Sequence, residues 1–189
     1  SSLFVRELYK CDFETYEAGK TITPPKEWGV WDGTLTAVKS GDTTAAQISA
    51  VSGAAKPFTI YMDRSFAGKN IMSMDLYIKD TNGTVTIMYK DNSSGNFINV
   101  FAIDGNKFKV FDKEVSFTIE SEKWYNFAIE NNSETNDTTI KVNGTEFVQT
   151  GKLTYKYPEI DYNRLSFRIV ARCSSGEQHD VYFDNLLLC

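Results

Sequence analysis

The sequence predicts an all-β fold, a two-sheet antiparallel jelly-roll β-sandwich. Apolar and polar residues alternate with a period of two through most of the chain, and helical periodicity is almost absent. The alternating segments are rich in Val, Ile, Thr, Phe and Tyr, which favour strands. Turn signals recur between them, and about a dozen short strands spaced in this way are typical of a sandwich or barrel rather than an α/β fold.

Two segments show the alternation most clearly. In 71–79 the alternate residues Met72 to Ile78 are apolar and are expected to face the core. In 164–172 the same holds for alternate residues from Leu165 to Ala171. Half-buried strands of this kind are typical of antiparallel sheets with one face in water.

Three turn signals separate predicted strands. Asn and Asp followed by Gly supply the positive φ angles that tight hairpin turns require. These signals are Asn82-Gly83, Asp104-Gly105-Asn106 and Asn143-Gly144. We therefore expect tight turns at all three places.

Composition limits the domain organisation and the classes of partner. The length of 189 residues suits one domain, residues 1–189, and we expect a monomer. The net charge is −5, and the basic residues are scattered rather than clustered, which excludes a nucleic-acid partner. No apolar run approaches the roughly 20 residues of a membrane-spanning helix.

The two ends of the chain resemble a known family. Cys11-Asp12-Phe13-Glu14 is followed by Gly19 and Trp28, and near the other end of the chain stands the segment 180–186, Asp-Val-Tyr-Phe-Asp-Asn-Leu. This pair resembles the frame of bacterial carbohydrate-binding jelly rolls of the family 4, 9 and 22 type. The resemblance implies a jelly-roll fold that binds sugar.

A third stretch points to a related group. The segment 123–129, Lys-Trp-Tyr-Asn-Phe-Ala-Ile, is followed by Val142-Asn143-Gly144. It is similar to the concanavalin A/laminin G-like sandwiches, in which such a strand precedes a hairpin. Both groups are jelly-roll β-sandwiches, so the two resemblances imply the same fold.

The resemblance also implies a structural calcium ion. In the resembled modules the first and last strands are neighbours, and Ca²⁺ joins them through carboxylates and backbone carbonyls. Glu14 and Asp184 would lie on those strands, and Asp12 shares the face of Glu14, because strand residues two apart point the same way. Calcium takes six to eight oxygen ligands. We expect Ca²⁺ here; the alternative is that these are exposed acids at a sheet edge.

The chain has three cysteines, Cys11, Cys173 and Cys189. Their spacing fits no zinc pattern, because no Cys-x-x-Cys occurs and His179 is the only histidine. If any two cysteines form a disulfide, we expect Cys11 and Cys189, because the terminal strands of the resembled modules are neighbours. Three unpaired thiols are the alternative.

No set of catalytic residues is predicted. Glucanases of concanavalin-like fold carry Glu-x-Asp-x-Glu on one strand, whereas here Glu159 and Asp161 are followed by Asn163 where the second Glu would stand. We therefore expect this pair to lie in a solvated turn after Pro158 rather than to act in catalysis. A polysaccharide lyase would need a His or Tyr base, and His179 lies in a predicted hairpin, where a single histidine is usually at the surface.

Aromatic residues supply the candidates for sugar binding. Trp28 and Trp31 lie in the long loop 19–33, and an indole ring can stack on the apolar face of a pyranose. The alternative is that these indoles cover the open end of the core. Tyr77 and Arg168 are further candidates.

A polar surface is also expected from outward strand positions, if their strands are adjacent, and paired arginines on it would suit a carboxylate-bearing sugar. Its residues would be Asp75, Tyr77, Asn126, Glu130, Arg168 and Arg172.

The sequence therefore indicates a non-catalytic carbohydrate-binding module that tethers an extracellular enzyme or a cell-surface protein to polysaccharide. We expect a bacterial, secreted or surface-exposed protein in which this domain is covalently attached to further domains. One alternative is a polysaccharide-degrading hydrolase or lyase on the same fold. Another is a protein-adhesion module of the laminin G kind. Fold alone does not distinguish these functions.

Overall fold

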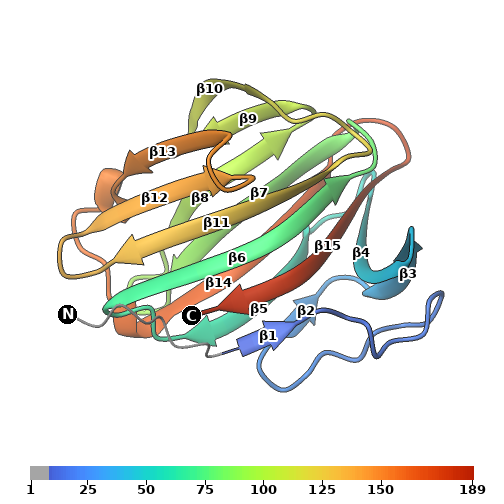
Figure 1. Ribbon diagram of the computed structural model, residues 1–189, viewed down its shortest axis with the longest axis horizontal. Helices are drawn as coiled ribbons and strands as arrows, with labels where there is room; N and C mark the ends of the chain where they lie inside the picture. The colour runs from blue at the N-terminus through green and yellow to red at the C-terminus, as the bar shows by residue number, and fades with distance from the viewer. Residues whose placement is uncertain (1–8) are drawn as a thin grey trace.

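The computed structural model describes residues 9–189, and antiparallel strands in two facing sheets make up most of it (Figure 1). We call the 8-stranded sheet sheet A and the 7-stranded sheet sheet B. The predicted all-β, two-sheet antiparallel jelly-roll sandwich is confirmed. Figure 1 shows β11, β6 and β15 of sheet A in front of β8, β7 and β14 of sheet B.

Sheet A has the strand order β13-β12-β11-β6-β15-β4-β3, and β1 also pairs with β15. Its strands are β1 (Tyr9–Cys11), β3 (Thr36–Ser40), β4 (Thr43–Val51), β6 (Lys69–Ile78), β11 (Trp124–Asn132), β12 (Asp137–Val142), β13 (Phe147–Gly151) and β15 (Gln178–Leu188).

Sheet B has the strand order β10-β9-β8-β7-β14-β5-β2. Its strands are β2 (Gly29–Trp31), β5 (Phe58–Arg64), β7 (Gly83–Asp91), β8 (Phe97–Asp104), β9 (Lys107–Val110), β10 (Lys113–Thr118) and β14 (Leu165–Cys173). Two short 3₁₀ helices, Leu153–Tyr155 and Tyr162–Arg164, lie between β13 and β14.

The core lies between the sheets and is built by the alternation that the sequence shows. In β6 the residues from Met72 to Ile78 are buried at every second position, as predicted. In β14 the alternate residues from Leu165 to Ala171 are buried as predicted, but Ser166 and Arg168 between them are buried as well. Phe127 of sheet A stacks on Phe101 of sheet B with ring centroids 4.7 Å apart. Burying each such ring stabilises the fold by about 1.5–3 kcal/mol, so these contacts hold the sheets together.

Two of the three predicted hairpin turns are confirmed. The signals at Gly105 and at Asn143-Gly144 form hairpins, β8–β9 and β12–β13, with positive φ as expected. The expectation of a hairpin at Asn82-Gly83 is wrong, because this turn carries the chain from sheet A into sheet B. A Cβ at Gly83 would lie 1.9 Å from the carbonyl oxygen of Arg172, so this glycine permits close pairing of β7 with β14.

The expected common polar surface does not form. Asp75, Tyr77, Asn126 and Glu130 lie on β6 and β11 of sheet A, whereas β14, which carries both arginines, is in sheet B between β7 and β5. Outward residues of the two sheets face opposite directions. Arg168 and Arg172 therefore share one face of the molecule, and the other four residues lie on the opposite one.

The terminal strands are antiparallel neighbours, as expected, because β1 pairs with β15. Their register contradicts the disulfide between Cys11 and Cys189. Cys11 lies opposite Leu186, three positions from Cys189, which is about 10 Å along a strand and too far for a disulfide. Cys11 has a free thiol.

Across residues 9–189, no helix combines the length and the apolar character needed to cross a membrane.

Candidate functional site

A well-lined hollow lies on the outer face of sheet B. Its volume is about 690 Å³, within the range of roughly 300–1,000 Å³ of small-ligand sites. Strands β2, β5, β14, β7 and β8 each contribute side chains, as does the loop before β5. The residues that line it are Val30, Trp31, Asp32, Lys56, Pro57, Thr59, Met88, Phe97, Arg168, Val170 and Arg172. We call it the sheet B pocket.

Arg168 is the centre of an aromatic cluster at this pocket. Its guanidinium carbon lies 5.1 Å from the ring centroid of Trp31, 5.7 Å from that of Tyr61 and 5.6 Å from that of Phe97. Strand register explains the arrangement, since Arg168 pairs with Tyr61 on the neighbouring strand β5. Cations are attracted to the faces of aromatic rings, so the three rings fix the plane of the guanidinium.

The rings of the cluster differ in exposure. Trp31 is 48% exposed and Phe97 is 47% exposed, whereas Arg168 is only 6% exposed. Large apolar rings left half in water beside a hollow are unusual and mark a surface that can take a ligand. The pocket thus presents aromatic surface at its rim with a positive charge beneath.

Few polar groups of the protein contact Arg168. Its Nε donates to Ser166 Oγ at 3.2 Å. Among the described residues, no carboxylate lies within salt-bridge distance of the guanidinium. Burial lowers the pKa of Arg168 below its usual value, while the charge of Asp63 acts in the opposite direction. The group nevertheless stays charged at neutral pH, because an arginine pKa starts above 12.

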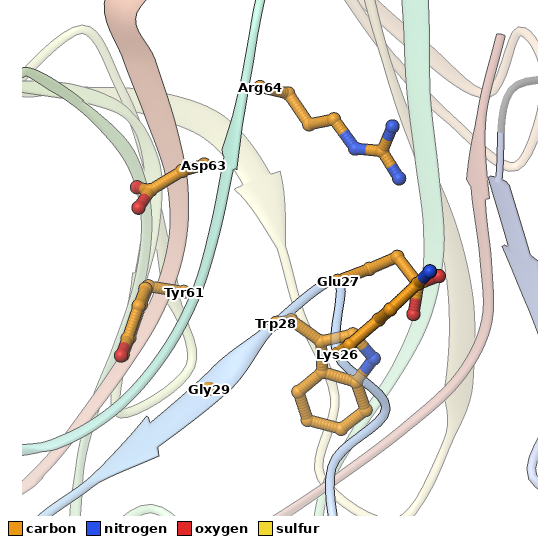
Figure 2. A pocket seen from close by; sticks show the side chains of 7 residues that line it. All are labelled: Lys26, Glu27, Trp28, Gly29, Tyr61, Asp63 and Arg64. Carbon is orange, nitrogen blue, oxygen red and sulfur yellow. The ribbon is translucent and has the colours of Figure 1, made fainter.

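A second hollow of about 500 Å³ is lined by Tyr61, which also belongs to the cluster around Arg168 (Figure 2). Figure 2 shows Tyr61 and Asp63 pointing to one side of β5 and Arg64 to the other. Gly29 lies opposite Tyr61 in the β2–β5 pairing, and a Cβ there would come within 2.7 Å of the Tyr61 ring. This glycine therefore gives the Tyr61 ring its place beside Trp31, 5.0 Å away between centroids.

The two tryptophans of the loop have different environments. Trp28 is 5% exposed and packs edge-on against Phe13 and Phe183, and its Nε1 donates to the Tyr9 hydroxyl at 2.6 Å. Trp28 also lines the second hollow (Figure 2), so it both packs in the core and borders that hollow. Trp31 alone of the pair offers exposed ring surface.

Tyr77 lies on the opposite face of the molecule from the sheet B pocket. It belongs to a cross-strand row on sheet A, where its ring stacks on Tyr182 at 5.2 Å and contacts Trp124 at 5.4 Å. Of the four residues predicted to bind sugar, the structure brings Trp31 and Arg168 together at the sheet B pocket, places the buried Trp28 at the adjoining hollow and leaves Tyr77 on the opposite face.

Tyr61 and Phe97 are the site residues that sequence reasoning missed. The signal was present in both cases. In β5 Tyr61 alternates with the apolar Ile60 and Met62, and in β8 Phe97 alternates with Ile98. The period of two therefore placed both rings outward, but only the fold could show that β5 and β8 flank β14 and β7 on the same face.

The predicted calcium residues lie near one another at the end of β15. Asp184 is 5% exposed, and its burial, together with the charges of Glu14, Asp75 and Asp12, raises its pKa to about 6. Glu14 accepts from the backbone N–H of Thr44 at 3.0 Å. Asp12 and Glu14 are not on the first strand as expected, because β1 ends at Cys11 and Phe13 takes a positive φ of 58°.

This acidic group is incomplete as a metal site. Within the residues that the structure describes, no three His, Cys, Asp or Glu side chains form a group that could hold a metal ion. Calcium also accepts backbone carbonyls and water as ligands, so such a group is not required for it. Calcium binding is taken up below as a proposal.

The residues considered for catalysis have structural partners. Asp161 caps the second 3₁₀ helix by accepting from the N–H of Asn163, and Glu159 is exposed in the loop before it, so the pair does not lie on a strand. His179 is fully buried in β15, with its Nδ1 2.6 Å from Asp80 Oδ1, which corrects the expectation of a surface histidine.

Comparison with known proteins gives no family by sequence. No family model matches the chain, and no curated protein matches it. Solved structures do match. A sialidase superposes with a TM-score of 0.67 at 13% identity, covering 96% of this chain, which spans only 18% of the length of that sialidase.

Two further structures are similar over most of their own length. The cellulose induced protein Cip1 has a TM-score of 0.63 at 11% identity and covers 96% of both chains. The alginate lyase A1-II′ has a TM-score of 0.59 at 10% identity, with 81% of this chain and 82% of that chain covered. At such identities the similarity establishes the fold, which this chain shares with carbohydrate-active jelly-roll sandwich proteins.

Proposed function

We propose that the chain is a non-catalytic carbohydrate-binding module whose sheet B pocket holds a sugar. The observation that carries the proposal is Trp31, a half-exposed indole at the rim of a hollow of about 690 Å³. Indole rings stack on the apolar faces of pyranoses, and nearby donors bond the hydroxyls. Phe97 provides a second exposed ring, and Arg168, Arg172 and Lys56 provide donors.

The adjoining hollow beyond Tyr61 supports a ligand longer than one sugar. It is lined by Lys26, Glu27, Asp63 and Arg64, which offer both donors and acceptors to hydroxyl groups (Figure 2). Two neighbouring hollows joined by an aromatic row suit an oligosaccharide segment of a polysaccharide. In an extracellular or cell-surface protein with attached domains, such binding would raise the local concentration of the polysaccharide.

The composition of the pocket favours binding over hydrolysis. A glycoside hydrolase of the usual kind needs two carboxylates flanking the bond. Among the described residues that line the sheet B pocket, Asp32 is the one carboxylate, and the further carboxylates of the proposed site, Glu27 and Asp63, line the adjoining hollow. The likeness of the fold to that of an alginate lyase keeps a degrading enzyme as the second candidate.

The proposal is tested by retention on insoluble polysaccharides and by an array of oligosaccharides. We expect the protein to bind at least one polysaccharide, and Trp31→Ala to weaken that binding by at least about tenfold, or 1.4 kcal/mol. Val148→Ala removes a similarly exposed apolar side chain from sheet A and is expected to bind like the parent protein.

Two results would count against this function. If no polysaccharide is retained, the binding module is wrong. If incubation with the retained polysaccharide releases new reducing ends or unsaturated products, the protein is an enzyme and the second candidate is correct.

We also propose a structural Ca²⁺ beside Asp184, with Glu14 and Asp12 as the further carboxylate ligands. A cation would offset the negative charge that accumulates around the buried Asp184 carboxylate. Each acidic side chain uses one oxygen in a hydrogen bond: Thr44 N–H donates to Glu14 Oε1, Asn185 N–H to Asp184 Oδ1 and Glu14 N–H to Asp12 Oδ1. The second oxygens would bind calcium, which would complete its shell with carbonyls and water.

Calcium is expected to raise the melting temperature of the protein, because a ligand that binds only the folded state stabilises it by mass action. The Asp184→Asn variant should not respond to calcium, since an amide is a weaker ligand than a carboxylate. An unchanged melting curve in excess calcium, together with no metal found by elemental analysis, would refute the site.

A further inference from the structure

The sheet B pocket is basic although the protein is acidic. Three of its lining residues, Lys56, Arg168 and Arg172, carry positive charge, and only Asp32 carries negative charge. The chain as a whole has a net charge of −5. A positive hollow on a negative protein attracts anions to that place in particular.

Arg168 has donors that the protein does not use. A guanidinium carries five N–H groups in a planar fork, and the one hydrogen bond that the described residues accept from it is that of Nε to Ser166 Oγ. The described polar atoms that are fully buried without a hydrogen-bond partner do not include its two terminal nitrogens. They therefore reach the solvent of the pocket that Arg168 lines.

Burying the Arg168 guanidinium costs free energy unless another group accepts its hydrogen bonds. Arg168 is only 6% exposed, and its burial costs hydration energy that the charge of Asp63, which lies beyond salt-bridge distance, offsets only in part. The aromatic rings of Trp31, Tyr61 and Phe97 replace part of that hydration. They also hold the planar fork in one orientation, which is the state required for two parallel hydrogen bonds to a carboxylate.

We propose that the pocket binds an acidic sugar, whose carboxylate pairs with Arg168 while its ring packs on Trp31. This inference rests on the proposed function and names the class of sugar. Hydroxyl groups of a neutral sugar would be served equally well by neutral donors, which carry no cost of burying a charge. A uronate within a chain and a terminal sialate both present this carboxylate.

The test compares each acidic ligand with its own neutral form. The ligands are oligomers of uronic acids and a sialylated oligosaccharide, each with a matched sample in which the carboxyl groups have been reduced to alcohols. Titration calorimetry is expected to show at least tenfold tighter binding of one acidic ligand than of its reduced form. The ligand that binds distinguishes a uronate chain from a terminal sialate.

Variants assign the effect to Arg168. Arg168→Met keeps an apolar stem among the rings and should abolish the preference for the acidic form. Arg168→Lys keeps the charge but loses the fork, so its preference should be intermediate. Arg172→Gln removes a positive charge from an exposed residue of the same pocket and should weaken the preference for the acidic form. It replaces the Arg168 variants in the test if either of them unfolds. Lys39→Gln removes one positive charge from sheet A and should bind like the parent protein.

The outcomes separate the two proposals. Equal binding of the acidic and reduced forms would overturn the acidic-sugar inference and leave the binding module intact. Stronger binding of sulfated than of carboxylated sugars would also overturn it. Failure to bind any sugar, neutral or acidic, would remove the proposed function and this inference together.

Discussion

Replacing Trp28 with alanine is expected to lower the free energy of unfolding by about 3–5 kcal/mol, as truncation of a large buried aromatic side chain does. The indole is 5% exposed and packs against Phe13 and Phe183. Its removal leaves a cavity at the end of the core where the loop after β1 meets β15. The Tyr9 hydroxyl also loses the hydrogen bond from Nε1.

Thermal or urea unfolding measures this loss of free energy of unfolding, and two further variants serve as controls. Trp28→Phe keeps a ring in the same space and should recover a large part of the stability. Trp31→Ala is expected to cost less than about 1.5 kcal/mol, because its side chain is 48% exposed. Equal destabilisation by Trp28→Ala and Trp31→Ala would contradict the assignment of one indole to the core and the other to the surface.

Stability should depend on the ionisation of Asp184. Its pKa is raised to about 6 in the folded protein, first by burial and then by the charges of Glu14, Asp75 and Asp12. An unfolded aspartate has a pKa of about 3.9. The folded state therefore favours the protonated form, so stability from this group is present below about pH 4 and is lost as pH rises through about 6.

Asp184→Asn isolates that contribution from the other carboxyl groups. Without calcium, we expect the variant to match the parent protein near pH 4 and to be more stable by on the order of 2–3 kcal/mol at pH 7.5, from a shift of about two pKa units. The backbone N–H of Asn185, which donates to Asp184 Oδ1 at 2.8 Å, can bond the amide oxygen instead. Urea unfolding in chelator at both pH values provides the measurement. A variant less stable than the parent at pH 7.5 would contradict the raised pKa.

The sequence predicted the individual strands well, but it did not predict which strands pair with one another in each sheet. The period of two in β14 and β6 placed Arg168 and Tyr77 away from the core. Tyr77 is half-buried on sheet A, whereas Arg168 is only 6% exposed, because aromatic rings of neighbouring strands cover it. The placement of both residues on a common surface was wrong, because it depended on which strands pair. Pairing joins residues far apart in the chain, and β14 contacts β5 across about a hundred residues, so no local pattern carries that information.

The two tryptophans of the loop 19–33 also show that local sequence patterns do not predict where a single side chain lies in the fold. Composition placed Trp28 and Trp31 in one Gly- and Pro-containing segment, and nothing local distinguished them. In the structure β2 begins at Gly29, pairs with β5 and directs Trp31 to the outer face beside Tyr61. Trp28 precedes that strand and falls over the end of the core.

By itself the sequence determined the all-β sandwich and the core-facing residues of its main strands. These properties follow from periodicity and composition, which each segment carries locally. Only the tertiary structure decided where a ligand site could form. The basic pocket needs Arg168 beside Trp31, Tyr61 and Phe97, four residues from four strands, and their proximity results from long-range pairing within sheet B.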